Sequence, residues 1–133
     1  MDEWKRMRRA GLTQVAQGAD TGSAKVMRLM NKTFQKLEMI HEAADVLTQA
    51  GVRPSFNMIF AYPGEERADQ RESLKLVMDI CRNYPGAEFW TNIFTPYPGA
   101  PVMEHAFELG IDVPKKLEEW ADFFPRYTVL PWL

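Results

Sequence analysis

The chain has 133 residues, of which 46% are hydrophobic and 26% charged, and its formal net charge is −2. This length and composition are those of one soluble globular domain with a sizeable core. The charge offers no basic field that would suggest nucleic acid, and no apolar run approaches the ~20 residues of a membrane span.

The cysteine and histidine content argues against export and against a metal site. Cys81 is the single cysteine, so no internal disulfide can form. Residues 1–9 lack the apolar core of a signal peptide, and we therefore expect a cytoplasmic protein. His41 and His105 have no second ligand at a useful spacing, so neither suggests a bound metal.

The amino-terminal part alternates helical and strand patterns. We expect a helix over residues 2–10, a short strand over 12–17 and a brief helix over 24–30. Thr33 is expected to cap the next helix, which Gly51 ends. The apolar stripe of that helix comprises Phe34, Leu37, Ile40, Ala44 and Leu47.

A second strand over residues 55–60 has two distinct faces. Alternation along a strand would turn Phe56, Met58 and Phe60 toward the helices. The opposite face, which would line an interior, carries Ser55, Asn57 and Ile59.

The remaining pattern repeats the alternation of strand and helix. A helix over residues 67–82 has an apolar stripe at i, i+3, i+4 and i+7, which places Cys81 in the core beside Leu74, Val77 and Met78. A third strand is expected over 88–94, followed by helices over 102–109 and 114–124. This rhythm predicts an α/β fold with three parallel strands and flanking helices.

Each predicted strand runs into a turn rich in glycine or proline. The turns are residues 18–23 (GADTGS), 61–65 (AYPGE) and 95–101 (TPYPGAP). The carboxyl ends of parallel strands are where α/β folds collect their active-site loops. We therefore take the three turns together as the candidate site.

Several residues of these turns have both a functional and a structural interpretation. Asp20 would accept hydrogen bonds from a ribose diol or an amine, or else Asp20 or Ser23 caps the helix that follows. The stiff turn at 95–101 either lines a pocket or makes a rigid crossover. The mid-strand amides of Asn57 and Asn92 need partners, which a ligand or a neighbouring strand would supply.

Taken together, the three turns resemble the C-terminal half of a radical S-adenosylmethionine enzyme. Residues 17–23, with 26–32 after them, are similar to the fourth-strand pattern of that family, G-x-E-S-G-S followed by N/R-K. Residues 56–65 are similar to its fifth-strand pattern, G-x-P-G-E. Residues 94–101 resemble the F-x-P-Y-P-G-T-P turn of cobalamin-binding members, among them oxidative cyclases.

The resemblance implies a partial (β/α)6 barrel, of which residues 1–133 would form the C-terminal half. The family holds a 4Fe–4S cluster through a C-x3-C-x2-C motif after the first strand. That motif is missing from this sequence, as are the first three strands, so the resemblance assigns no metal ligand to the chain. Kinship with the cobalamin-binding members would add a cobalamin to the parent enzyme.

The resemblance also implies part of an S-adenosylmethionine pocket. The ribose and methionyl groups would lie near Gly18, Asp20, Gly22 and Ser23. The adenine side would be shaped by Ala61, Pro63, Gly64 and Glu65, and the loop closing over the ligand would contain Thr95, Pro96 and Tyr97. Asn57 would reach into the barrel interior. The sequence departs from the family at two positions, with Asp20 in place of Glu and Ala61 in place of Gly.

The resulting expectation is a fragment of a radical S-adenosylmethionine enzyme that is inactive alone. Its partners would be the missing N-terminal half and the small-molecule substrate of the parent. We also expect a homodimer, because a half-barrel would leave an open strand edge. The alternative is a non-catalytic α/β binding or assembly module that retains the fold.

Overall fold

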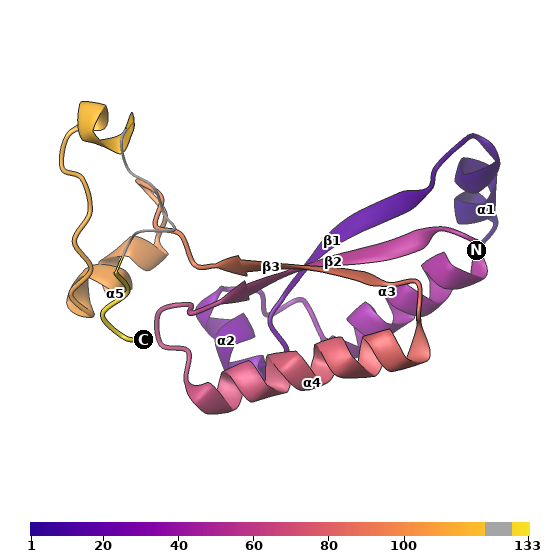
Figure 1. Cartoon of the computed structure of the whole chain (residues 1–133), viewed down its shortest axis with the longest axis horizontal. Helices are drawn as coiled ribbons and strands as arrows, with labels where there is room; N and C mark the ends of the chain where they lie inside the picture. The colour runs from indigo at the N-terminus through magenta and orange to yellow at the C-terminus, as the bar shows by residue number, and fades with distance from the viewer. Residues whose placement is uncertain (122–128) are drawn as a thin grey trace.

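The computed structural model describes residues 1–121 and 129–133. In these residues three parallel strands form one sheet, in the order β1-β2-β3 (Figure 1). Strand β1 spans Gln14–Asp20, β2 spans Arg53–Phe60 and β3 spans Glu88–Ile93. The predicted fold class, α/β with three parallel strands and flanking helices, is confirmed, and it is compatible with a piece of an α/β barrel.

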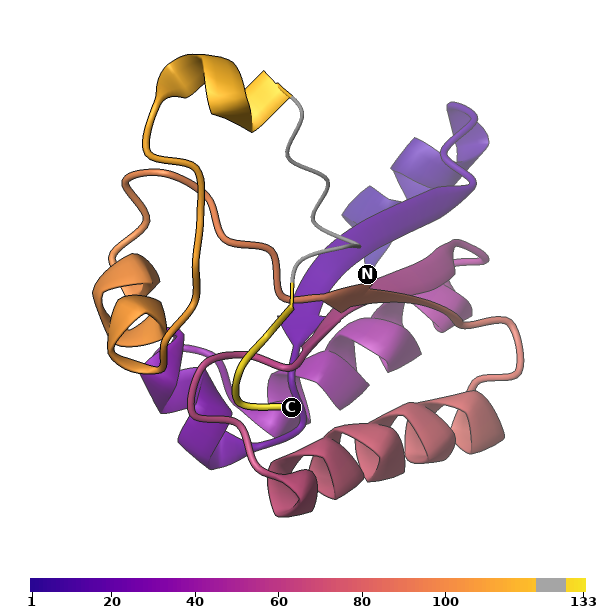
Figure 2. The same ribbon diagram turned by 60° about the vertical axis from the view of Figure 1, so that its left-hand side comes forward.

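The helices of the described residues cover one face of the sheet and both of its ends. Helices α2 (Ala24–Leu29), α3 (Leu37–Gln49) and α4 (Arg67–Asn83) lie together on one face (Figures 1 and 2). Helix α5 (Val102–Glu108) lies beyond the carboxyl ends of the strands, while α1 (Asp2–Arg9) packs at their amino ends. The described helices are each too short or too polar to cross a membrane.

The main core lies between the sheet and helices α3 and α4. Phe56 and Met58 of β2 are 1% and 0% exposed, which confirms the predicted helix-facing side of this strand. The ring of Phe56 also contacts Phe89 of β3, with 5.4 Å between ring centroids. The helices contribute the buried side chains of Ile40, Ala44, Leu76 and Ile80.

Strand β1 begins and ends later than predicted, since residues 18–20 belong to the strand rather than to the turn. Gly18 pairs with Asn57 and Asp20 pairs with Met58, with an irregularity between them. The glycine and aspartate that mark a turn in the sequence are held in strand pairing by β2. The first turn is therefore shorter than its sequence suggests.

Helix α3 starts at Leu37, so the prediction that Thr33 caps it is wrong. Lys36 occupies the cap position and makes no side-chain hydrogen bond to the helix. Phe34 lies before the helix and is 72% exposed, which removes it from the apolar stripe. Ile40, Ala44 and Leu47 of the stripe are buried as predicted, and Gly51 follows the helix with a φ of 73°.

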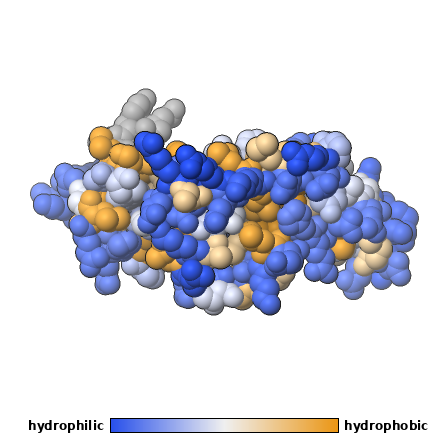
Figure 3. Space-filling view, turned by 90° about the horizontal axis from the view of Figure 1, so that it is seen from below, coloured by the Kyte–Doolittle hydropathy of each residue, from blue (hydrophilic) through white to orange (hydrophobic). Residues whose placement is uncertain are grey.

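Of the predicted core face of α4, Val77 is half-buried against the main core, but the other three residues are exposed. Leu74 and Met78 are 51% and 59% exposed, and Cys81 is exposed as well. The helix instead buries the side that carries Asp69, Ser73, Leu76 and Ile80. The helix layer seen from below is mostly hydrophilic, with apolar surface showing at several places (Figure 3).

The end of the chain differs from the helix predicted over residues 114–124. A 3-10 helix, η1, covers only Leu117–Ala121, and residues 122–124 lie outside the described residues. The final residues return to the body of the protein. Leu130 is buried against Phe94, and the indole Nε1–H of Trp132 donates to the carbonyl of Ala61 at 3.0 Å.

Candidate functional site

The carboxyl ends of the three strands and the turn at 95–97 surround one depression, and the turn at 61–65 contributes no residue to its lining. The volume of the depression is about 600 Å³, which lies within the range of ligand-binding cavities. The predicted site residues that line it are Asp20, Asn57, Thr95 and Tyr97, so every strand contributes. The rest of the lining comes from Ile59, Asn92, Ile93 and Phe94.

Asp20 reaches the depression with its charge already paired. Its backbone is left-handed, with a φ of 60°, and the residue is 9% exposed. The carboxylate forms an ion pair with Lys32, whose Nζ also lies 3.4 Å from the carbonyl oxygen of Gly18. A ligand at Asp20 would therefore meet a carboxylate and an ammonium side by side.

The two mid-strand amides differ in their partners. The side chain of Asn92 donates to the carbonyl of Met58 at 3.4 Å, so a neighbouring strand supplies its partner. Asn57 lies between Gly18 and Trp90 in the sheet, and within the described residues no protein group bonds its amide. Asn57 is therefore the strand amide that a ligand in the depression would satisfy.

Ser23, by contrast, lies in the interior and caps α2. Its Oγ donates to Asp69 of α4 at 2.7 Å and accepts from the N–H of Val26 at 3.4 Å. The neighbouring N–H of Gly22 donates to Ser73 Oγ at 2.9 Å. The helix-cap interpretation thus holds for Ser23, and the end of the first turn is fastened to α4.

Gly22 has a packing reason to be glycine. A Cβ at this position would lie 2.6 Å from the carbonyl oxygen of Glu72 and 2.7 Å from the Cα of Ser73. Both are backbone atoms of α4, which real Cβ atoms do not approach so closely. Gly18 is less crowded, since its nearest neighbour would be an Asp20 carboxylate oxygen at 3.0 Å.

The carboxylate of Asp69 anchors this contact and stays ionised. Burial opposes its charge, but hydrogen bonds from Ser23, from the N–H of Glu66 and from Lys25 together lower its pKa. Lys25 lies 3.2 Å from Asp69 and 2.7 Å from Glu66. Glu66 and Asp69 also form a capping box that begins α4.

The second turn folds around Glu65, which is only 8% exposed. Its Oε2 accepts from the N–H of Ala61 and, at 3.3 Å, from the side chain of Gln70. Its Oε1 is buried without a partner in the described residues, and burial raises the pKa of this carboxyl. Ala61 is held at a φ of 59°, a region that favours glycine.

Other segments cover this turn from outside. A Cβ on Gly64, whose φ is 84°, would lie 3.1 Å from Leu29 and 3.4 Å from His105 of α5. Pro63 is fully buried, and Trp132 bonds the carbonyl of Ala61. The predicted adenine side is therefore mostly interior, and the covering contacts of Leu29 and His105 were not predicted from the sequence.

The third turn combines a buried proline with exposed groups. Pro96 is fully buried, whereas Tyr97 is 65% exposed and lines the depression. Thr95 Oγ1 donates to the carbonyl of Ile93 at 3.3 Å. The turn thus serves as a rigid connection and also borders the depression.

The sequence interpretation missed one charged residue at this edge. Lys32, the partner of Asp20, was noted only as part of the resembling segment and was given no role. Its position soon after the first turn was the one feature of the sequence that could have indicated a role for Lys32 at this edge. Chemically, the edge offers the Asp20–Lys32 ion pair, the Asn57 amide and the Tyr97 phenol to a polar ligand.

No residue cluster indicates a metal within the described ranges, where no three His, Cys, Asp or Glu side chains are placed to hold an ion. Comparison with known proteins adds no assignment. No model of a known protein family matches the chain, and no curated protein sequence matches it either. The site therefore has to be interpreted from its own residues and from the three turns.

Proposed function

We propose that the chain contributes half of the S-adenosylmethionine pocket of a radical S-adenosylmethionine enzyme of the cytoplasm. The three turns resemble those of that family in order and spacing. The observation that carries the proposal is that Asp20, Asn57 and the turn at 95–97 come together around one depression of about 600 Å³.

The chemistry of the depression suits S-adenosylmethionine. The methionyl group of the ligand carries an ammonium and a carboxylate, which the Asp20–Lys32 pair would complement. The Asn57 amide would hydrogen-bond a ribose hydroxyl or a ring nitrogen. The exposed ring of Tyr97 would lie over the ligand and exclude water from one side.

The iron–sulfur cluster of such an enzyme does not fit this chain. Cubane clusters are held by several thiolates, and Cys81 is the single cysteine. It lies exposed on α4, outside the residues that line the depression. Other parts of the enzyme would therefore bind the cluster, any cobalamin and the substrate. We expect the chain alone to be inactive.

The second candidate is a non-catalytic α/β binding or assembly module. It is favoured by the structural roles of Gly22, Ser23 and Glu65, which pack inside the protein and explain their residue types without a ligand. In this case the fold would be retained and the depression would bind no S-adenosylmethionine.

Calorimetric titration with S-adenosylmethionine separates the two candidates. If S-adenosylmethionine occupies the depression, it should bind weakly, and Asp20→Asn should reduce its affinity by about 10- to 150-fold, equivalent to about 1.5–3 kcal/mol for a hydrogen bond to a charged group. Asp79→Asn, which changes an exposed carboxylate on α4, is the matched control and should leave the binding unchanged.

Two results would contradict the pocket. Binding that Asp20→Asn and Asp79→Asn affect equally would show that the ligand lies elsewhere. A folded wild-type chain that takes up no S-adenosylmethionine at millimolar concentration would favour the module instead.

A further inference from the structure

Strand β1 is an edge strand with little protection along its first half. In the part of the chain that the structure describes, its backbone pairs only with β2. Natural edge strands usually carry lysine, proline or a bulge that discourages pairing. Residues 14–17 read QVAQ and have none of these. The irregularity at Gly18, and the Gln35 amide that donates to its carbonyl, affect only the far end.

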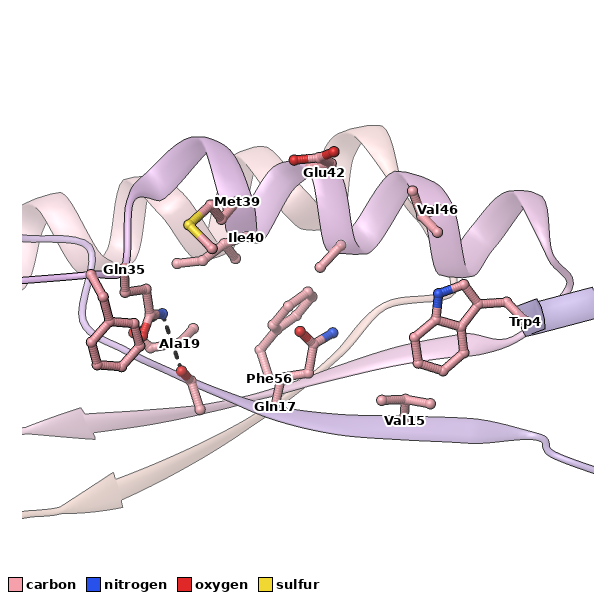
Figure 4. A pocket seen from close by; sticks show the side chains of 13 residues that line it. Trp4, Val15, Gln17, Ala19, Gln35, Met39, Ile40, Glu42, Val46 and Phe56 are labelled. Carbon is pink, nitrogen blue, oxygen red and sulfur yellow. Dashed lines mark hydrogen bonds between the residues drawn. The ribbon is translucent and has the colours of Figure 1, made fainter. Parts of the chain in front are cut away.

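An apolar groove lies beside this edge, on the helix side of the sheet (Figure 4). Its volume is about 510 Å³, and α1, β1, α3 and β2 all contribute to its lining. Trp4 lies at one end and Gln35 at the other, with Met39, Ile40 and Phe56 between them. An open edge and an apolar groove side by side make a continuous surface for another polypeptide.

The apolar groups at the two ends of the groove complement each other. Near the beginning of β1, Trp4 packs against the same buried cluster as Leu12 and Val15. Phe34 adjoins Gln35 at the opposite end and is 72% exposed. A two-fold axis through the middle of β1 would run two copies of the strand antiparallel. Each exposed Phe34 would then meet the Trp4 end of the partner's groove.

The charges at the two ends are complementary as well. Helix α1 is net positive at the beginning of β1, since its exposed cations, which include Lys5, Arg6 and Arg9, outnumber its exposed acids Asp2 and Glu3. Helix α3 presents the exposed Glu38 and Glu42 nearer the other end, and they outnumber the exposed Lys36 at its cap position. The same two-fold axis places the cations of each copy opposite the carboxylates of the other.

We propose that β1 and this groove form a two-fold interface between two copies of the chain. Strand β1 pairs antiparallel with its counterpart, so that two three-stranded sheets join, and Phe34 of each copy enters the groove of the other. Such self-complementary surfaces characterise two-fold dimers. The inference does not rest on the proposed function but competes with it, because in a whole barrel the free edge of β1 would pair with the missing N-terminal half instead of a second copy.

Sedimentation equilibrium over a wide concentration range would measure the dissociation constant of the expected dimer. Phe34→Glu should raise its dissociation constant by about tenfold or more, since a carboxylate would have to enter the apolar groove. Leu74→Glu is the matched control, because Leu74 is an exposed apolar residue of α4 outside the groove. It should leave the dissociation constant unchanged.

A charge exchange tests the two-fold geometry itself. One variant carries Arg6→Glu and Arg9→Glu, and the other carries Glu38→Arg and Glu42→Arg. Each variant alone brings like charges together and should dimerise about tenfold or more weakly than wild type. A mixture of the two restores opposite charges at both ends of the interface, so heterodimers should form with near wild-type affinity.

Three outcomes would overturn the proposal. The first is a wild-type chain that remains monomeric at millimolar concentration. The second is a dimer that Leu74→Glu weakens as much as Phe34→Glu does. The third is a charge-exchanged mixture that associates no better than its components.

Discussion

Replacing Gly22 with alanine would test whether this glycine exists for packing or for a ligand. The added Cβ would lie 2.6 Å from a carbonyl oxygen and 2.7 Å from a Cα of α4. The helix cannot move away cheaply, since Ser73 and Asp69 hold it to the same turn through hydrogen bonds. Overpacking typically destabilises a protein by 1–3 kcal/mol, and a backbone clash belongs at the upper end, so we expect about 3 kcal/mol.

Urea and thermal unfolding of Gly22→Ala beside Gly86→Ala would measure this effect. A Cβ on Gly86 would meet nothing within 4 Å, so its variant should stay within about 0.5 kcal/mol of wild type. For a domain of this size, a loss of about 3 kcal/mol lowers the melting temperature by roughly 10 °C. Wild-type stability in Gly22→Ala, together with weaker S-adenosylmethionine binding, would refute the packing argument and restore a ligand role.

Two further substitutions probe the second turn. Burial raises the pKa of Glu65, so the folded chain holds this proton more tightly than the unfolded chain does. Stability should therefore fall as pH rises from the ordinary glutamate pKa of about 4.3 toward the raised value, and Glu65→Gln should flatten this part of a denaturation series. Glu118→Gln changes an exposed carboxylate and should leave the pH dependence of stability unchanged. The same pH dependence in Glu65→Gln as in wild type would show that Glu65 is not its cause. Trp132→Phe removes the 3.0 Å bond to the carbonyl of Ala61 and should lower the free energy of unfolding by about 1 kcal/mol. Trp90→Phe, at a side chain that is 61% exposed, is its comparison, and equal losses in urea unfolding would show that the bond contributes nothing.

The existence of three parallel strands was predictable from the sequence because strand patterns alternate with helical ones, although the bounds of β1 were not. Phe56 and Met58 alternate with polar residues, and this alternation fixes which face of β2 meets the helices. The position of the three turns at one edge follows from parallel pairing. The sequence therefore predicted the edge of the sheet at which the turn residues lie, although it did not predict their contacts.

The orientation of α4 was not predictable, because polar contacts override its apolar stripe. The spacing of Leu74 and Met78 is that of a core-facing helix, yet both are exposed. Asp69 and Ser73 turn inward instead, since the turn after β1 supplies their hydrogen-bond partners from a distant part of the sequence. A pattern that counts only apolar residues cannot detect a buried polar contact of this kind.

The same contacts impose an order on how the chain can fold. Helix α2 has six residues, too few to persist without external support, and its cap Ser23 is held by a carboxylate 46 positions further along. The N–H of Gly22 finds its partner, the hydroxyl of Ser73, 51 positions further along the chain. A nascent chain leaving the ribosome can therefore pair β1 with β2 before the turn that follows β1 is secured. The turn after β1 is synthesised before the other two turns, but its hydrogen bonds form only after α4 has left the ribosome and packed against it.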